Sequence, residues 1–229
     1  MQRVRFTGLY RGVRAVNRRD AMVRIGLLSD VHSRPAPVAE ALSIFSSRGV
    51  DHVWCAGDIA GYGGQLEETV TLLEGSGCRA IRGNHELRYL AQLEEGAETM
   101  ASRFFRQLPA VLDETVAGKR VYMVHAHPPD ACMGGIKLLD KQGAIITERV
   151  AQWTGKLGAF DYDVLVVGHT HQVFAEQLGR TLVVNPGSTA FNHSCAVLAL
   201  PEMSVEVFAL SGKAIERTWN WSDHVIYGG

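Results

Sequence analysis

The sequence predicts one α/β domain that contains two β-sheets. Its 229 residues, 46% of them hydrophobic, are enough for a single domain with a sizeable core. From residue 23 to residue 107, short apolar runs alternate with segments of helical period, an order typical of a parallel sheet covered by helices. From residue 110 to residue 210, short β-type segments predominate, which indicates a second sheet rather than a second domain. We expect the domain to span residues 23–229.

In the first half, each expected strand is a short apolar run followed by glycine or a polar residue. Between the strands, apolar positions recur at helical spacing, as Val38, Ala41 and Phe45 do. Gly49 and the GSG at 75–77 end the first two helices. The expected elements are strands at 23–28, 52–55 and 79–82, helices at 38–48 and around 66–73, and a helical segment at 87–107.

In the second half, two short segments joined by Ala-Gly-Lys at 117–119 predict a β-hairpin. Residues 128–136, PPDACMGGI, have the composition of a loop, and residues 138–153 are predicted to be helical. The apolar run VLVV at 164–167 predicts a buried strand. The other expected strands are 110–116, 120–124, 173–177, 181–184, 196–200 and 205–210.

Polar side chains follow the ends of five of these strands. His169 and His171 come directly after VLVV and a glycine, and residues two apart in an extended chain project to the same side. One His-x-His after a strand is typical of an exposed loop, but Asp, Asn or His also ends four other apolar runs. Because open α/β sheets bind ligands beyond the carboxyl ends of their strands, we expect these side chains to converge. The set is Asp30, His32, Asp58, Asn84, His125, His169 and His171.

These seven candidate ligands offer only oxygen and nitrogen atoms. Carboxylate, amide and imidazole together suit Mn²⁺, Fe, Zn²⁺ or Ni²⁺ and do not choose among them. Seven ligands are too many for one ion and suit two ions that share a carboxylate. Two ions roughly 3.5–4 Å apart can lower the pKa of a bound water from about 15.7 to about 7 and hold a phosphate for in-line attack.

The motifs that contain these residues resemble the calcineurin-like metallophosphoesterase superfamily in order and approximate spacing. They are Asp30-x-His32, Gly57-Asp58, Gly83-Asn84-His85-Glu86, His125 and Gly168-His169-Thr170-His171. The GDIAGYGG loop at 57–64 and Asn-Pro-Gly-Ser at 185–188 are similar to its small bacterial and archaeal phosphodiesterase branch. The resemblance covers about residues 23–210. It implies a four-layer α/β/β/α sandwich with mixed sheets.

The resemblance further implies two divalent metal ions that share Asp58 as a bridge. One ion would be bound by Asp30, His32 and His171, and the other by Asn84, His125 and His169. Mn²⁺ is the first expectation for the metal, with Fe, Zn²⁺ or Ni²⁺ as alternatives. His127 lies two residues beyond His125 and is a second candidate imidazole. We assign the ligand role to His125, because it directly ends its strand.

His85 is the expected catalytic residue. The resemblance places it above the metals, as general acid or as a cation that stabilises the transition state, while metal-bound hydroxide attacks phosphorus. The other class of function is a binding scaffold on the same fold, as in the retromer subunit of the superfamily, which lacks this histidine. Retention of His85 favours the enzyme, a phosphoric ester hydrolase.

Two departures from the family pattern bear on the substrate. Protein phosphatases of the superfamily carry GDxxDRG, whereas IAGY follows Asp58 here. That loop therefore lacks two residues of the family pattern. They are the acidic residue that would orient His85 and the arginine that would bind a phosphate monoester. This favours a phosphodiester substrate, with a phosphomonoester as the alternative. Arg34 stands where many relatives have Asn, and Arg34 and Tyr62 are candidate substrate contacts.

Charge is unevenly distributed along the chain. Residues 1–24 contain seven arginines and one acidic residue, which leaves a net charge of −7 from residue 25 onward. So negative a domain disfavours long nucleic acid as a partner, and we expect a small phosphate ester instead. Residues 1–22 are predicted to be a flexible basic extension, or to precede a natural start at Met22, with a transit peptide as the alternative. The oligomeric state is left open.

The cysteines and the hydropathy indicate where the chain acts. The four cysteines form no C-x-x-C pair and lie mostly in or beside apolar runs, which fits thiols in a reducing compartment. They are Cys55, Cys78, Cys132 and Cys195. No segment approaches the length of a membrane span. We therefore expect a cytoplasmic protein with no membrane partner.

Overall fold

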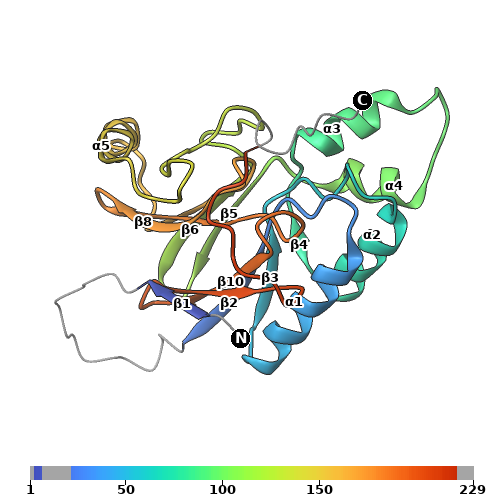
Figure 1. The fold of residues 1–229 in the computed structure, drawn as a ribbon. Helices are drawn as coiled ribbons and strands as arrows, with labels where there is room; N and C mark the ends of the chain where they lie inside the picture. The colour runs from blue at the N-terminus through green and yellow to red at the C-terminus, as the bar shows by residue number, and fades with distance from the viewer. Residues whose placement is uncertain (1–2, 7–21, 221–229) are drawn as a thin grey trace, which may run out of the picture.

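Two mixed β-sheets pack face to face at the centre of the computed structural model, which describes residues 3–6 and 22–220 (Figure 1). The six-stranded sheet contains β1 (Arg3–Phe6), β2 (Val23–Leu28), β3 (His52–Cys55), β4 (Arg79–Ala80), β10 (Ser194–Leu200) and β11 (Ser204–Ala209). Their order is β1-β11-β10-β2-β3-β4. β2, β3 and β4 are parallel, whereas β10 pairs antiparallel with β2.

The second sheet has five strands. They are β5 (Val111–Val116), β6 (Lys119–Val124), β7 (Val164–Val166), β8 (Val173–Leu178) and β9 (Thr181–Pro186). The order is β5-β6-β7-β9-β8, with β6, β7 and β9 parallel and the two edge strands antiparallel to their neighbours. The hairpin turn predicted at residues 117–119 joins β5 to β6, and Ala117 and Gly118 both have positive φ.

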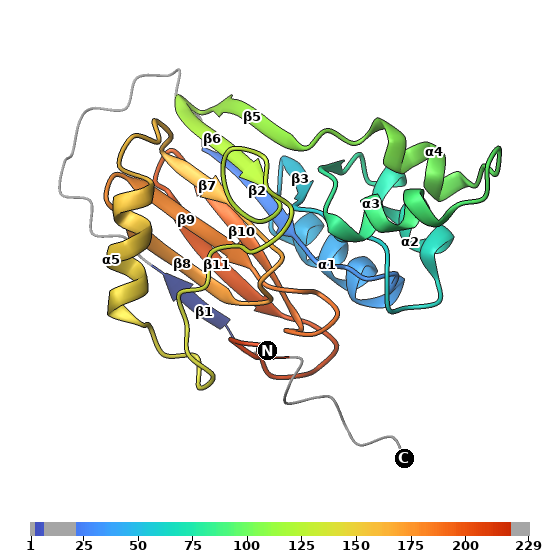
Figure 2. The ribbon, with the colours of Figure 1, turned by 90° about the horizontal axis from the view of Figure 1, so that it is seen from above.

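Helices cover the outer faces of both sheets. They are α1 (Pro35–Ser47), α2 (Leu66–Gly75), α3 (Asn84–Gln92), α4 (Met100–Gln107) and α5 (Thr147–Lys156). Seen from above, α5 lies on one side of the molecule and α1 to α4 gather on the other (Figure 2). The predicted four-layer α/β/β/α sandwich is confirmed. The longest described helix has 13 residues, and none of those described could cross a bilayer.

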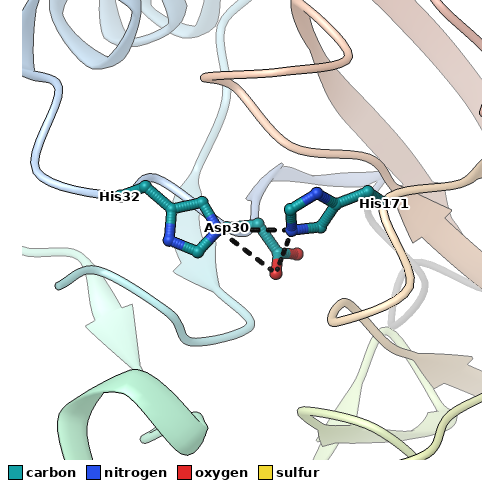
Figure 3. Close-up of side chains that lie close together, drawn as sticks. All are labelled: Asp30, His32 and His171. Carbon is teal, nitrogen blue, oxygen red and sulfur yellow. Dashed lines mark hydrogen bonds and ion pairs between the residues drawn. The ribbon is translucent and has the colours of Figure 1, made fainter. Parts of the chain in front are cut away.

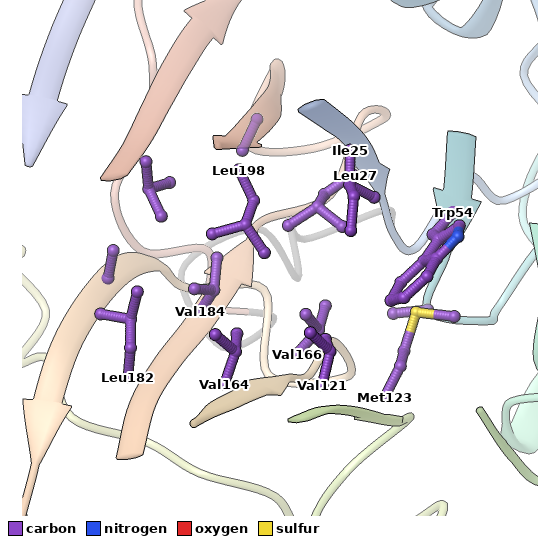
Figure 4. Close-up of a cluster of buried hydrophobic side chains, with 14 of the residues drawn as sticks. Ile25, Leu27, Trp54, Val121, Met123, Val164, Val166, Leu182, Val184 and Leu198 are labelled. Atoms are coloured by element: carbon purple, nitrogen blue, oxygen red, sulfur yellow. The ribbon is translucent and has the colours of Figure 1, made fainter. Parts of the chain in front are cut away.

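Three apolar clusters fill the three interfaces between the four layers. The central one lies between the sheets and includes Ile25, Leu27 and Val164 (Figure 4). Because successive strand residues point to opposite faces, the neighbours of these residues belong to the outer clusters. Leu28 packs with α1 and α2, and Leu165 packs beneath α5. This alternation fixes the register of the strands, and with it the position of the residues that follow them.

The predicted helix at 138–153 is wrong in its first half. The helix begins only at Thr147, because the preceding backbone finds other partners. The N–H groups of Leu138 and Leu139 donate to Gln172 Oε1 at 2.8 and 3.0 Å. Asp140 Oδ1 accepts from the N–H groups of residues 142 and 144, a local turn that competes with helix.

The helical segment predicted at 87–107 is two helices rather than one. The chain leaves α3 after Gln92 and turns at Gly96, which has φ 80°. Thr99 then caps α4, since its side chain accepts a hydrogen bond from the N–H of Ser102 while the Ser102 hydroxyl accepts one from the N–H of Thr99.

The structure describes only part of the N-terminal extension that was predicted at residues 1–22. Residues 3–6 form β1, which pairs antiparallel with β11 at the edge of the six-stranded sheet. Residue 22 is exposed next to β2. The rest of the predicted extension, residues 1–2 and 7–21, lies outside the described residues.

Candidate metal centre

The candidate ligands lie beyond the carboxyl ends of the parallel strands, where the sequence predicted them. Residues 30 and 32 follow β2, residue 58 follows β3, residue 125 follows β6, and residues 169 and 171 follow β7. Asn84 is the first residue of α3. Positive φ angles of 48–62°, costly for residues other than glycine, occur at five of the seven: Asp30, His32, Asp58, His169 and His171.

Asp30, His32 and His171 form one cluster (Figure 3). The Nε2 atoms of the two histidines are 3.2 Å apart. Asp30 Oδ1 lies 3.2 Å from His171 Nε2 and 4.0 Å from His32 Nε2. His32 Nδ1 donates to the Ala60 carbonyl, which leaves the Nε2 lone pair directed into the cluster. Burial alone raises the pKa of Asp30, but His171 and the other imidazoles hold that pKa below its ordinary value.

A second cluster contains Asp58, Asn84, His125 and His169. Asn84 Oδ1 lies 3.2 Å from His125 Nε2, 3.0 Å from His169 Nδ1 and 3.2 Å from Asp58 Oδ2. His125 Nδ1 donates to the Ala56 carbonyl at 2.7 Å, so Nε2 is the ring nitrogen that faces this cluster. Two oxygens and two ring nitrogens therefore each lie within 3.3 Å of another member of the set. The donor set fits a divalent metal ion.

Asp58 lies between the two clusters. Its Oδ2 is 3.3 Å from His125 Nε2 in the second cluster. It also forms a group with His32 and His85 in which single ligand atoms lie within 4.8 Å of one another. His85 is partly exposed, with Nε2 4.0 Å from Asp58 Oδ2 and its ring 4.9 Å from that of His32. The structure thus brings together all seven candidate ligands, with His85 at their edge.

Glu86 supports the candidate metal centre, and the sequence did not predict this role. Its side chain is fully buried, and its carboxylate accepts hydrogen bonds from the N–H groups of Asp58, Ala60 and Gly83 at 2.6–2.9 Å. It therefore ties the loop that carries Asp58 to the start of α3, which carries Asn84. The available signal was its position as the third residue of that helix, where a glutamate completes a capping box.

The protonation of the imidazoles differs across the site. Burial lowers the pKa of His32 to about 4, and burial together with the charge of His125 lowers the pKa of His169 to about 4. Burial also acts to lower the pKa of His125, but the Asp58 carboxylate outweighs it and raises that pKa to about 9. His32 and His169 are therefore neutral at neutral pH, the form in which imidazole binds a metal.

An aromatic wall lies against the Asp30 cluster. We define it as Tyr62, Phe191 and the guanidinium of Arg34, two of which the sequence proposed as substrate contacts. The Tyr62 ring, whose residue is 56% exposed, has its centroid 4.8 Å from those of both His32 and His85. Phe191 stacks on His171 at 5.3 Å, and Arg34 Cζ lies 5.0 Å from the Phe191 centroid. No motif or periodicity marked Phe191.

Two further residues support the loops that carry the candidate ligands. Asn185 Nδ2 donates to the Gly168 carbonyl and to the Thr170 hydroxyl, which steadies the loop between the two histidines after β7. Ser188 donates to the backbone carbonyl of Asp30. His127, the alternative to His125, is outside both clusters, with its ring 5.8 Å from that of Trp153.

Known proteins resemble this chain in sequence and in fold. A probable metallophosphoesterase of Methanothermobacter thermautotrophicus is 28% identical over 196 residues, which cover 84% of this chain and 88% of the relative. A hypothetical protein of Pyrococcus horikoshii has a similar solved structure, with TM-score 0.67 and 16% identity over 82% of this chain and 88% of the other. A novel archaeal phosphodiesterase superimposes with TM-score 0.54 and 18% identity, over 82% of this chain and all of the other.

The family model for the calcineurin-like phosphoesterase superfamily domain matches residues 23–202. These residues contain both clusters, His85 and Glu86. The chain therefore belongs to the calcineurin-like phosphoesterase superfamily.

Proposed function

We propose that this protein is a phosphodiesterase that depends on two divalent metal ions, with Mn²⁺ as the preferred metal. The observation that carries the proposal is the position of Asp58 between two sets of imidazole, amide and carboxylate donors. Two bound ions would supply an activated water and neutralise charge on the phosphate. Asp30, His32 and His171 would hold one ion, and Asn84, His125 and His169 the other.

We propose that His85 donates a proton to the leaving oxygen. Its backbone N–H donates to Asp58 Oδ1 at 2.9 Å, which fixes the residue at the start of α3 beside the shared carboxylate. Its ring remains partly exposed between Tyr62 and His32, where a substrate can reach it. Burial lowers the pKa of His85 and so makes its imidazolium a stronger acid.

The surroundings of His85 favour a diester over a monoester. A Cβ added at Gly61 would lie 2.2 Å from His85 Nδ1, so the backbone of Gly61 occupies the place from which an acidic side chain would orient this ring. We propose Arg34 and Tyr62 as substrate contacts on the aromatic wall, with Arg34 donating to an unesterified phosphate oxygen. The similar fold of the archaeal phosphodiesterase is consistent with this substrate class.

The test is hydrolysis of bis(p-nitrophenyl) phosphate by protein loaded with Mn²⁺, and its loss on adding a chelator. His85→Ala should lower kcat by about 10²–10⁴, the usual contribution of a positioned acid or base, while metal content stays near two ions per chain. His52→Ala, at an exposed position in β3, is the matched control and should change neither value. Loss of metal from His85→Ala with unchanged activity per bound ion would contradict the role given to His85.

The same assay separates the enzyme from a binding scaffold. A chain that binds two ions yet hydrolyses neither monoesters nor diesters with any of Mn²⁺, Fe²⁺, Zn²⁺ and Ni²⁺ would be a scaffold. We also propose a cytoplasmic location, because all four cysteines are free thiols.

A further inference from the structure

A cavity of about 500 Å³ opens beside the loop that follows β6. None of the residues that line it belongs to the two clusters of candidate ligands, and α5 supplies one wall. The lining residues are His127, Pro128, Gly134, Gly135, Trp153 and Lys156.

This cavity shares a wall with the metal centre. A Cβ added at Gly135 would lie 2.6 Å from Thr170 Cγ2 and 3.3 Å from His169 Cδ2, so the bare backbone of Gly135 packs directly against the His169 loop. Its φ of 95° also demands glycine. The same loop approaches the second cluster at Cys132, whose carbonyl lies 3.2 Å from the Asn84 amide. The loop at 132–135 therefore borders both the second cluster and the cavity.

The cavity combines a flat aromatic surface with a positive charge. Trp153 is partly buried against the core beneath α5, which holds its ring in place. Lys156, one turn later on the helix, is exposed and has Nζ 4.3 Å from the Trp153 ring centroid. His127 Nδ1 donates to the Pro128 carbonyl, which leaves Nε2 directed toward Gly134 as a hydrogen-bond acceptor. An indole face stacks nucleobases, and an exposed ammonium pairs with phosphate.

We propose that this cavity binds the nucleoside of a nucleotide phosphodiester whose scissile phosphate lies at the metal centre. The base stacks on Trp153, and Lys156 moves from the indole face to pair with a second phosphate on the same nucleoside. This inference rests on the proposed function, because it names the substrate class of that site.

Three esters with the same p-nitrophenol leaving group test the proposal on the Mn²⁺-loaded protein. They are methyl p-nitrophenyl phosphate, thymidine 5′-(p-nitrophenyl phosphate) and the 3′-phosphate of the latter. We expect kcat/KM to be at least about tenfold higher for the thymidine ester than for the methyl ester, and higher again with the 3′-phosphate, since stacking contributes a tenfold effect or more. Equal values for the methyl and thymidine esters would overturn the proposal.

Variants assign the effect to the cavity. Trp153→Ala should remove about tenfold of the thymidine advantage, and Lys156→Ala should remove the advantage of the 3′-phosphate, while the methyl ester is unaffected. Trp153→Leu keeps apolar bulk beneath α5 without an aromatic face, and it serves if the alanine variant does not fold. Arg106→Ala, which removes an exposed charge on α4, is the control and should change no ratio. Retention of the full thymidine advantage in both Trp153 variants would place the base elsewhere.

Binding separates failure of this inference from failure of the proposed function. If no ester is hydrolysed, calorimetry with thymidine 3′,5′-bisphosphate and the metal-loaded protein still tests the cavity. A Kd for this bisphosphate that is about tenfold higher in Trp153→Ala than in wild type would support binding in the cavity. Absence of binding, or equal binding by wild type and Trp153→Ala, would overturn it.

Discussion

The two clusters that meet at Asp58 are held in place by different means. In the first, the imidazoles are positioned by rings: His171 stacks on Phe191, and His32 lies edge-on to Tyr62. In the second, the backbone is positioned by the buried Glu86 carboxylate, which joins two loops through three N–H groups. The first half of the site is therefore held by ring packing in addition to hydrogen bonds such as that from His32 to the Ala60 carbonyl, and the second depends mainly on the Glu86 hydrogen-bond network. Substitutions should damage the two halves separately.

The largest loss of metal and of activity is expected from a substitution at Asp58, where the two halves of the site meet. Asp58→Asn should release both ions and reduce hydrolysis to the level of chelator-treated protein, because the proposed function assigns this carboxylate to both of them. Metal content measured after dialysis checks the expectation. Asp130→Asn, on the exposed loop after β6, is the control and should retain both ions. Retention of one tightly bound ion by Asp58→Asn would show that the halves are independent.

Glu86→Gln should damage the second half. The amide presents an NH₂ group to backbone N–H donors, so at least one buried donor loses its partner, at about 1–3 kcal/mol in stability. Partners that orient metal ligands typically contribute 10–100-fold to metal affinity, and we expect a loss in that range for one of two ions titrated by calorimetry. Glu67→Gln provides the control, since this glutamate accepts from the N–H of Ala101 at the start of α4. Equal weakening of both ions would refute the separation.

Phe191→Leu should weaken the first half more mildly. It removes the ring that stacks on His171 and on Trp219 and that lies beneath Arg34. A stacked aromatic pair contributes about 0.5–1.5 kcal/mol, so the affinity for the other ion should fall roughly 2–10-fold. The comparison with Glu86→Gln is decisive: if the two variants affect the same ion, the two halves are not held separately.

The smallest effect concerns acid stability of the metal-free protein. Because the folded-state pKa of His169 is about 4, below its unfolded value of about 6.5, the folded chain binds fewer protons in that window. The stability that His169 contributes above pH 6.5 is lost as the pH falls toward 4. The raised pKa of Glu86, about 7, acts in the opposite sense above about pH 4.5, so only a comparison of variants isolates the histidine.

His169→Gln should therefore show a shallower fall in Tm than wild type between pH 6.5 and 4. Roughly 2–4 °C is expected for each kcal/mol at this chain length. The exposed His52→Gln should follow the wild-type curve. A His169→Gln curve parallel to wild type would show that the imidazole titrates normally.

The sequence was most informative where local rules and tertiary structure agree. Apolar runs that end in Asp, Asn or His predicted both the strands and the edge where the ligands gather. Between β6 and α5 the prediction failed, because the partner of residues 138 and 139 is Gln172, far along the chain. Phe191 escaped notice for the same reason: its importance comes from contact with His171, which no local pattern reveals. Glu86 was detectable as a helix cap, but not as the link between two loops.

The position of β10 in the sheet has a consequence for folding during synthesis on the ribosome. This strand, residues 194–200, lies between β11 and β2 in the interior of the six-stranded sheet. After β2, β3 and β4 have been synthesised, more than a hundred further residues must be added before β10, the neighbour of β2, is made. Until then the edge of β2 is an open template for pairing with other chains. Truncation before residue 194 should accordingly yield an aggregating fragment rather than a smaller enzyme.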